Sequence, residues 1–502
     1  MSTMPPQFPL EIRSALRWAS STVYFLRPIT TVVPPSFRHR TTLFRPRCFS
    51  SSSSSSVKLP TKPPLCTADE LHYVSVPNSD WRLALWRYLP PPQAPTRNHP
   101  LLLLSGVGTN AIGYDLSPGC SFARHMSSQG FETWILEVRG AGLSTRVSDL
   151  KDVEESAHEL SNQIESTARA AADDTQLYER FNEIRSKLLS LIESKQNSGL
   201  VNQIRELAQR LVNLFDDGQK SVSPPLIDLH ERLTTTIEDF QNQLDLIVKY
   251  DWDFDHYLEE DVPAAIEYVR AQTKPKDGKL FAIGHSMGGI LLYAMLSRCS
   301  FEGREPSVAA VATLASSVDY TTSDSALKLL IPLANPAEAL SVPVVPLGAL
   351  LAAAFPLSTR PPYVLSWLND LISSTDMMHP ELLEKLVLNN FCTIPAKLLI
   401  QLTTAFREGG LRDRSGKFYY KDHLPGTSVP VLALAGDRDL ICPPAAVEDT
   451  VKLFPDNLVT YKLLGEPEGP HYAHYDLVGG RLAVEQVYPC ITEFLSHHDS
   501  AA

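Results

Sequence analysis

A serine enclosed by glycines is the residue of this chain best placed to do chemistry. Ser286 lies within GHSMG (residues 284–288), after an apolar segment at 279–283 and before an apolar run at helical spacing over 290–296. A strand that turns directly into a helix here leaves no room for side chains beside the serine, which explains the glycines. Such a turn lifts the hydroxyl out of the sheet, and the N-terminus of the next helix favours negative charge beside it. The pattern therefore indicates a nucleophilic serine.

A serine nucleophile needs an imidazole base and a carboxylate that orients this base. Both residue types follow in the order acid, then histidine. A predicted strand at 429–436 is followed by two aspartates, and a second predicted strand at 458–464 is followed by a loop with two histidines. The carboxyl ends of parallel strands share one edge of a sheet, so these side chains are expected to converge with the serine. The candidates are Asp439 and Asp437 for the acid, and His474 and His471 for the base.

These motifs resemble those of α/β-hydrolases. Residues 110–122 (NAIGYDLSPGCSF) and 251–269 are similar to segments of polyhydroxyalkanoate synthases and depolymerases. The tail HYDLVGG (474–480), with VYPCITEFL (487–495), resembles acid lipases and the depolymerases. The resemblance covers roughly residues 70–144 and 250–495. Because the synthases use cysteine at this turn, Ser286 favours hydrolysis or simple acyl transfer over polymerisation.

The resemblance favours one member of each candidate pair. His474 matches the lipase-like tail and lies two residues before Asp476, which is expected to cap the last helix. The alternative base, His471, would otherwise be a solvated or supporting residue. Asp439 stands where the family places its acid; the alternative, Asp437, would otherwise form a turn. The expected triad is therefore serine, Asp439 and His474.

Two backbone amides are expected to stabilise the developing oxyanion. The residue after the nucleophile, Met287, supplies one of them. The other is expected from the loop after the Leu101–Leu104 strand, where Val107 is the best candidate. Many relatives have His-Gly in this loop, whereas this chain has Ser105-Gly106, so the hydrogen bonds that brace the loop must differ.

No cofactor or metal is expected. The 14 histidines are dispersed, without H-E-x-x-H spacing, and no Gly-rich phosphate loop of the G-x-x-x-x-G-K-[ST] type occurs. The seven cysteines, an odd number, include no C-x-x-C pair, which suits a reducing compartment and excludes a thiolate zinc site of the usual spacing.

Residues 1–56 are typical of an organellar transit peptide. They hold seven arginines, one acid (Glu11) and the serine run 50–56. We expect a chloroplast address, with a mitochondrion or an unaddressed disordered tail as alternatives. The whole chain carries −12, so removing this segment of net charge +6 leaves −18. Such a chain is not expected to bind nucleic acid through a general basic field.

Strand, helix and strand alternate over the rest of the chain, which predicts an α/β fold with a mostly parallel sheet flanked by helices. We expect this α/β-hydrolase core to be interrupted by a helical insertion and a helical cap. The expected segments are 70–144, 250–320 and 429–495 for the core, 145–249 for the insertion, and 321–428 for the cap or lid.

The insertion shows a nearly heptad apolar stripe through Leu226, Leu233, Phe240 and Ile247. This predicts packed helices, either a structural hairpin, a protein-binding coiled coil or a lid. In the cap, residues 339–359 carry no charge, a length that could span a bilayer. Three prolines interrupt them, so an apolar helix pair that walls an acyl pocket is the favoured interpretation. Such a pair could also make a reversible contact with a membrane surface.

The leading functional hypothesis is a serine hydrolase that cleaves a carboxylic ester of an apolar, lipid-like substrate through an acyl-enzyme. Two alternatives remain open from the sequence. The same triad could pass the acyl group to an alcohol or amine, as an acyltransferase does. The chain could also be a non-catalytic binding or scaffold protein that works through the inserted helices.

Overall fold

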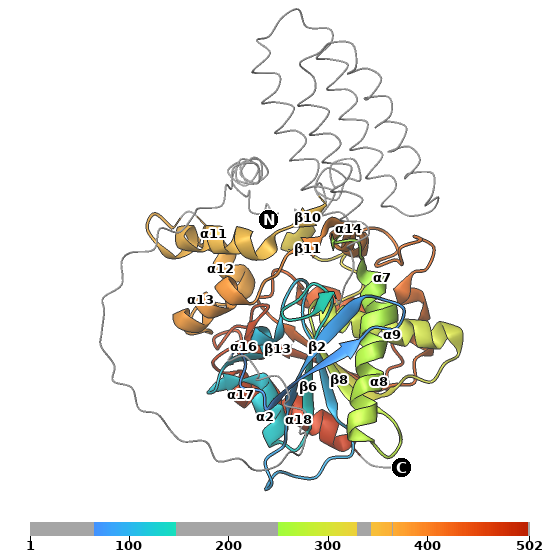
Figure 1. Cartoon of the computed structure of the whole chain (residues 1–502). Helices are drawn as coiled ribbons and strands as arrows, with labels where there is room; N and C mark the ends of the chain where they lie inside the picture. Colours follow the sequence, from blue (N-terminus) through green and yellow to red (C-terminus); the bar gives the residue numbers. More distant parts are fainter. Residues whose placement is uncertain (1–64, 147–248, 329–342, 364, 500–502) are drawn as a thin grey trace, which may run out of the picture. The chain divides into compact units, whose positions relative to one another are not determined.

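The structure is a computed structural model that describes residues 65–146, 249–328, 343–363 and 365–499 (Figure 1). The expected transit peptide (1–56) and all but the ends of the expected insertion (145–249) lie outside the described residues.

A mostly parallel sheet forms the centre of the described part of the chain. Its strand order is β1-β2-β6-β3-β8-β9-β12-β13, and the short β7 pairs with β2. The strands from β6 onward along this order run parallel, whereas β2 is antiparallel to both β1 and β6. This confirms the fold class predicted from the sequence. The strands are β1 (Glu70–Ser75), β2 (Trp81–Tyr88), β3 (Leu101–Leu104), β6 (Thr133–Glu137), β7 (Thr145–Arg146), β8 (Leu280–His285), β9 (Val308–Leu314), β12 (Val431–Gly436) and β13 (Val459–Leu464).

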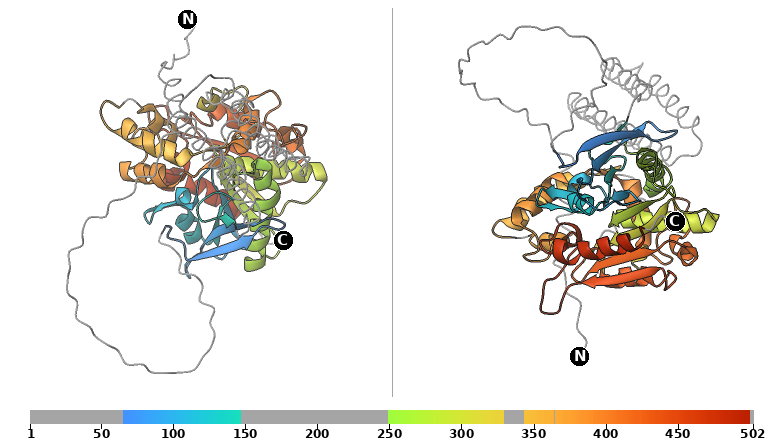
Figure 2. Two further views of the ribbon diagram at one scale, coloured as in Figure 1. Left: turned by 45° about the horizontal axis from the view of Figure 1, so that its top comes forward. Right: turned by 90° about the horizontal axis from the view of Figure 1, so that it is seen from below.

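The central strands are apolar throughout because helices cover them on both faces. Every residue of β3, β6, β8 and β12 is buried. Helices α2 and α18 lie on one face of the sheet, and α8 and α9 lie on the other (Figure 2). The helices around the sheet are α2 (Phe122–Ser128), α7 (Phe254–His256), the π-helical η2 (Tyr257–Asp261), α8 (Val262–Thr273), α9 (Met287–Glu302), α15 (Pro444–Val451), α16 (Asp476–Gly479), α17 (Ala483–Gln486) and α18 (Tyr488–His497).

A short 3-10 helix and a small hairpin follow β3 and lead into α2. They are η1 (Ala111–Tyr114), β4 (Asp115–Ser117) and β5 (Cys120–Ser121). Asn110 caps η1, since its side chain accepts a hydrogen bond from the amide of Ile112. This element therefore fixes the far end of the loop that leaves β3.

The segment between β9 and β12 folds as a helical cap with one small hairpin. Its elements are β10 (Val344–Val345), α11 (Leu347–Thr359), α12 (Trp367–Ile372), α13 (Pro380–Asn389), β11 (Ile394–Pro395), α14 (Ala396–Leu402), η4 (Thr403–Phe406) and η5 (Tyr420–Gly426). β10 and β11 pair antiparallel.

The expected pair of apolar helices in the cap is wrong in its described part. Residues 343–346 are extended and only α11 is helical, because Pro346, at ψ 67°, stands outside the helical region directly before α11. Ser358 is the one buried residue of α11, so this helix lies at the cap surface. Among the described residues, none of the helices combines the length and the apolar character needed to cross a bilayer.

The described chain leaves the core after β7 and returns to it at one aromatic cluster. Trp81, at the start of β2, makes an edge contact with Trp252, with ring centroids 5.3 Å apart. Tyr250 stacks on Trp252 at 5.2 Å, and the guanidinium of Arg146 lies 5.8 Å from the Trp81 ring. Residues on both sides of the undescribed segment 147–248 thus meet around a single indole.

Candidate active site

Ser286 occupies a strained turn between β8 and α9. Its backbone has φ 55° and ψ −121°, a conformation that non-glycine residues rarely adopt. Four hydrogen bonds hold it there. The Ser286 amide donates to the carbonyl of Leu314 (2.9 Å), and the Ser286 carbonyl accepts from the amides of Gly289 (3.0 Å) and Ile290 (3.1 Å) and from the hydroxyl of Ser316 (2.9 Å). The surrounding structure therefore imposes the conformation.

The glycines around the turn permit a close approach of three backbone segments. A Cβ on Gly284 would overlap the backbone of Gly288, and a Cβ on Gly288 would overlap the carbonyl of Leu104 at the end of β3. A Cβ on Gly289 would collide with the side chain of Ser316. Lack of space, as the sequence indicated, explains these three positions.

His474 and Asp439 form a buried pair. Nδ1 of His474 lies 2.8 Å from Oδ2 of Asp439, and both residues are at most 3% exposed. The other carboxylate oxygen of Asp439 accepts hydrogen bonds of 2.8 Å from the amides of Ile441 and Cys442. The amides that follow Asp439 in the chain therefore fix one carboxylate oxygen, and the other, Oδ2, orients the imidazole.

The two alternative candidates, Asp437 and His471, pair with each other. Nδ1 of His471 lies 2.5 Å from Oδ2 of Asp437, whose other oxygen accepts from the amide of Tyr472 (2.9 Å). Asp437 lies in a turn directly after β12, as expected for a residue outside the triad. His471 is partly exposed and supports this turn through its contact with Asp437. The two pairs connect the same two loops.

Asp476 does not cap the last helix, contrary to the expectation. It is the first residue of the four-residue α16, and its buried carboxylate accepts from the Ser373 hydroxyl (2.5 Å) and from the amides of Ser374 (2.7 Å) and Ala473 (2.8 Å). Burial, together with the charge of Asp439, raises the pKa of Asp476 to about 6. This residue ties the loop of His474 to the cap.

His285 connects the serine turn to the loop of His474. Its Nε2 lies 2.9 Å from the main-chain carbonyl of His474, and the two imidazole rings are 4.7 Å apart. Burial, and secondarily the proximity of His474, lower the pKa of His285 to about 3. His285 is therefore neutral and donates through Nε2–H. His285 was not among the expected site residues, and its position beside the serine was the only signal of its role in the sequence.

A small cavity of about 10 Å³ lies beside His285, enough for one water molecule. Its lining includes Ser105, Gly106, Thr109, Tyr114, His285 and Tyr475. Since Nε2 of His285 is engaged with His474, Nδ1 is left as a hydrogen-bond acceptor.

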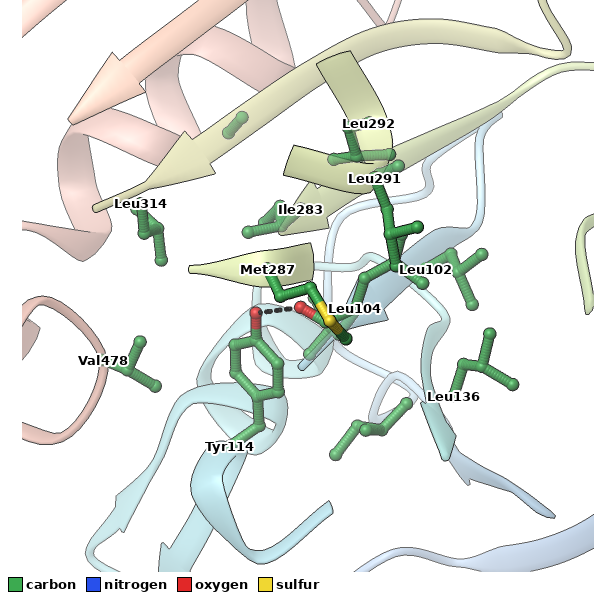
Figure 3. Close-up of a cluster of buried hydrophobic side chains, with 14 of the residues drawn as sticks. Leu102, Leu104, Tyr114, Leu136, Ile283, Met287, Leu291, Leu292, Leu314 and Val478 are labelled. Carbon is green, nitrogen blue, oxygen red and sulfur yellow. Dashed lines mark hydrogen bonds between the residues drawn. The ribbon is translucent and has the colours of Figure 1, made fainter. Parts of the chain in front are cut away.

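The loop after β3 passes directly beside the serine. A Cβ built on Gly106 would lie 3.4 Å from the Cβ of Ser286. Within the described ranges, neither expected oxyanion donor, the amide of Val107 or that of Met287, donates a hydrogen bond to another residue. At the far end of the loop, the Tyr114 hydroxyl donates to the Leu104 carbonyl (2.9 Å), close to the Met287 side chain (Figure 3).

The described residues contain no group of three or more histidine, cysteine or acidic side chains that could hold a metal ion. The arrangement is thus one of a half-buried serine, a buried Asp–His pair, and two backbone amides without partners in the described chain.

Comparisons with known proteins agree with this architecture. A family model described as the alpha/beta hydrolase fold matches residues 231–476, just under half of the chain. No curated protein matches the sequence. The fold is that of the α/β-hydrolases, as its strand order and this match show.

Several solved structures are similar across most of the chain. A monoglyceride lipase from Saccharomyces cerevisiae is 13% identical, with a TM-score of 0.46 over 88% of this chain and 99% of that one. An esterase from Thermogutta terrifontis is 14% identical, with a TM-score of 0.42 over 86% and 100%. A monoacylglycerol lipase from Paleococcus ferrophilus is 11% identical, with a TM-score of 0.41 over 82% and 99%.

Proposed function

We propose that this protein is a serine hydrolase that cleaves a carboxylic ester of an apolar, lipid-like substrate through an acyl-enzyme. The observation that carries the proposal is the buried Asp439–His474 pair, 2.8 Å apart. Its histidine loop is tied at 2.9 Å to His285, the residue directly before the strained Ser286. An orienting carboxylate and an imidazole are what a serine hydroxyl needs to become a nucleophile.

In the proposed first step, the Ser286 oxygen attacks the ester carbonyl while Nε2 of His474 takes the hydroxyl proton. Asp439, at Nδ1, stabilises the imidazolium that forms. The carbonyl oxygen becomes an oxyanion between the amides of Val107 and Met287. When the intermediate collapses, the alcohol leaves with the proton from His474, and Ser286 holds the acyl group.

The second step repeats this sequence with water. His474 removes a proton from the water molecule, which attacks the acyl carbon, and Ser286 leaves with that proton. The neutral state of His285 supports this chemistry, since a second positive charge 4.7 Å away would oppose formation of the His474 imidazolium.

The apolar nature of the proposed substrate rests on the cap. Its described segment 343–359 contains no charged residue, and α11 exposes part of almost every apolar side chain. A charged acyl group would gain no ionic partner from this segment, whereas an apolar chain would bury surface against it.

A fluorophosphonate probe with an alkyl chain tests the proposal directly. We expect the wild-type protein to be labelled at Ser286, as located by peptide mass spectrometry, and S286A to remain unlabelled. Turnover of p-nitrophenyl esters of 2 to 16 carbons should then increase with chain length before solubility limits it. An unlabelled, folded wild type would contradict the proposed function.

A further inference from the structure

Asn390, in the cap, is fully buried against the loop that follows β3. It comes directly after α13. Its Oδ1 accepts a hydrogen bond from the amide of Gly113 (3.0 Å), and its main-chain carbonyl accepts from the amide of Asn110 (3.0 Å). One residue of the cap thus receives two backbone donors from the loop, through a side-chain and a main-chain oxygen.

The same side chain reaches the other half of the site. Nδ2 of Asn390 donates to the hydroxyl of Tyr475 at 3.1 Å. Tyr475 directly follows His474, and its ring lies 4.7 Å from that of His285. Asn390 therefore joins the loop of Val107 to the residue next to the proposed base.

The neighbours of Asn390 extend this contact along the loop. The amide of Cys392 donates to the carbonyl of Gly108 (2.6 Å), and Phe391 forms an antiparallel bridge with Thr109. The side chain of Asn110 donates to the carbonyl of Asn389 (2.8 Å). Residues 389–392 run beside residues 108–113, so this cap segment braces the loop where Ser105-Gly106 replaces the more usual His-Gly.

The energetic consequence follows from how an oxyanion hole works. Its donors must already point at the developing charge, because reorganisation during the reaction raises the barrier. Val107 lies one residue before Gly108, whose carbonyl the cap holds. A buried amide such as that of Asn390 is also costly to leave without partners, so its geometry is tightly set.

We propose that Asn390 is a positioning residue: it holds the loop of the Val107 amide and the loop of His474 in the relative positions that attack on the substrate requires. The inference rests on the proposed function and deepens it. The cap is then part of the machinery that stabilises the oxyanion, and not only a cover for the substrate.

Asn390→Leu and Asn390→Asp are the variants that test this proposal. Leucine has a similar size and makes none of the side-chain hydrogen bonds. Aspartate can still accept a hydrogen bond from the amide of Gly113, and its other oxygen can accept one from the Tyr475 hydroxyl. Asn369→Leu is the matched control, since Asn369 is a cap asparagine whose side chain bonds only to Ser358 among the described residues.

We expect Asn390→Leu to lower kcat by about 10- to 100-fold with KM changed less than about threefold, part of the loss known for a deleted oxyanion donor. Binding of an alkyl boronic acid, which mimics the tetrahedral intermediate, should weaken in parallel. Asn390→Asp should recover at least about a third of the wild-type kcat. Asn369→Leu should leave kcat and boronate affinity unchanged.

Two results would overturn the proposal: a folded Asn390→Leu with wild-type kcat, whatever its melting temperature, or an equal loss of kcat in Asn369→Leu. If Asn390→Leu does not fold, Tyr475→Phe and Asn390→Ser take its place. A kcat unchanged in both would reject the role.

Hydrogen exchange separates this proposal from the proposed function. The amide of Gly113 loses its side-chain acceptor in Asn390→Leu and should exchange faster than in the wild type, whether or not the protein hydrolyses esters. Unchanged exchange rejects the brace, whereas an unlabelled wild type with increased exchange in the variant rejects only the esterase activity.

Discussion

Nε2 of His285 donates to the main-chain carbonyl of His474 across 2.9 Å. The residue before the proposed nucleophile is thereby tied to the residue proposed as its base. Because the bond is made to the backbone, it fixes where the His474 loop lies and leaves the His474 ring free to exchange protons.

Removing this bond should reduce the rate without removing the chemistry. We expect His285→Leu to lower kcat by about 10-fold, and His285→Gln, whose amide nitrogen can replace Nε2–H, to lower it less. The check is steady-state kinetics with a p-nitrophenyl ester, with melting temperatures measured in parallel. Equal losses in the two variants would mean that the hydrogen bond is not what matters.

His285 should also leave no trace in the pH dependence of activity. Burial lowers its pKa to about 3, so the ring is neutral at every pH above about 5. The pH profile of kcat/KM between pH 5 and 9 should therefore have the same midpoint in His285→Gln and in the wild type. A midpoint displaced by more than about half a unit would show that His285 carries charge in this range.

The two Asp–His pairs should differ sharply in their importance. We expect Asp439→Asn to lower kcat/KM by about 10³-fold or more, because the imidazole loses the carboxylate that orients it and stabilises its cation. Asp437→Asn should cost less than about 10-fold, since its partner His471 is partly exposed and lies outside the proposed triad. The reverse order would assign the acid to Asp437.

Two glycine-to-alanine substitutions near the serine, one in α9 and one in the loop after β3, should differ in their effect on stability. Gly288→Ala would drive a Cβ into the Leu104 carbonyl and should destabilise the protein by about 1–3 kcal/mol or prevent folding. Gly106→Ala places its Cβ at ordinary contact distances of 3.4–3.8 Å from three neighbours, one of them Nδ1 of His285. We expect Gly106→Ala to stay within about 1 kcal/mol of the wild type in urea unfolding.

Asp476 should make stability depend on pH. Its pKa of about 6 in the folded protein exceeds the value of about 3.9 in an unfolded chain. The folded state therefore binds the proton more tightly, and the resulting stability is complete below about pH 4 and lost as the pH rises through 6.

Comparison with Asp476→Asn isolates this contribution. The free energy of unfolding of the variant minus that of the wild type should increase by up to about 3 kcal/mol between pH 4 and 7, because only the wild type loses stability in this range. Urea unfolding at several pH values measures it. A difference independent of pH would show that the carboxyl has the same pKa in the folded and the unfolded state.

The local motifs of this site were readable from the sequence because each depends on neighbours in the chain. The serine turn requires glycines two positions away, and the strand before it is apolar because it is buried on both faces. The alternation of strands and helices was sufficient to predict the mostly parallel sheet.

Other features depend on contacts between residues far apart in the sequence, and no local pattern predicts them. Asn390 meets Gly113 across 277 positions, and its amide looks like any polar residue at a helix end. The mutual pairing of Asp437 and His471 likewise follows from how two loops face each other. In the cap, the uncharged run 339–359 suggested two helices. Only α11 is helical in its described part, because the backbone at Pro346 is outside the helical region.

The aromatic cluster around Trp81 has a consequence for how such a chain can change over time. Since Arg146 and Trp252 both lie beside the indole of Trp81, the described chain leaves the core and returns to it at the same place. A single genetic event could excise or exchange the intervening segment, and a short linker would suffice to reconnect the ends. A change in the length or sequence of residues 147–248 can therefore leave the packing of the sheet and its helices unaltered.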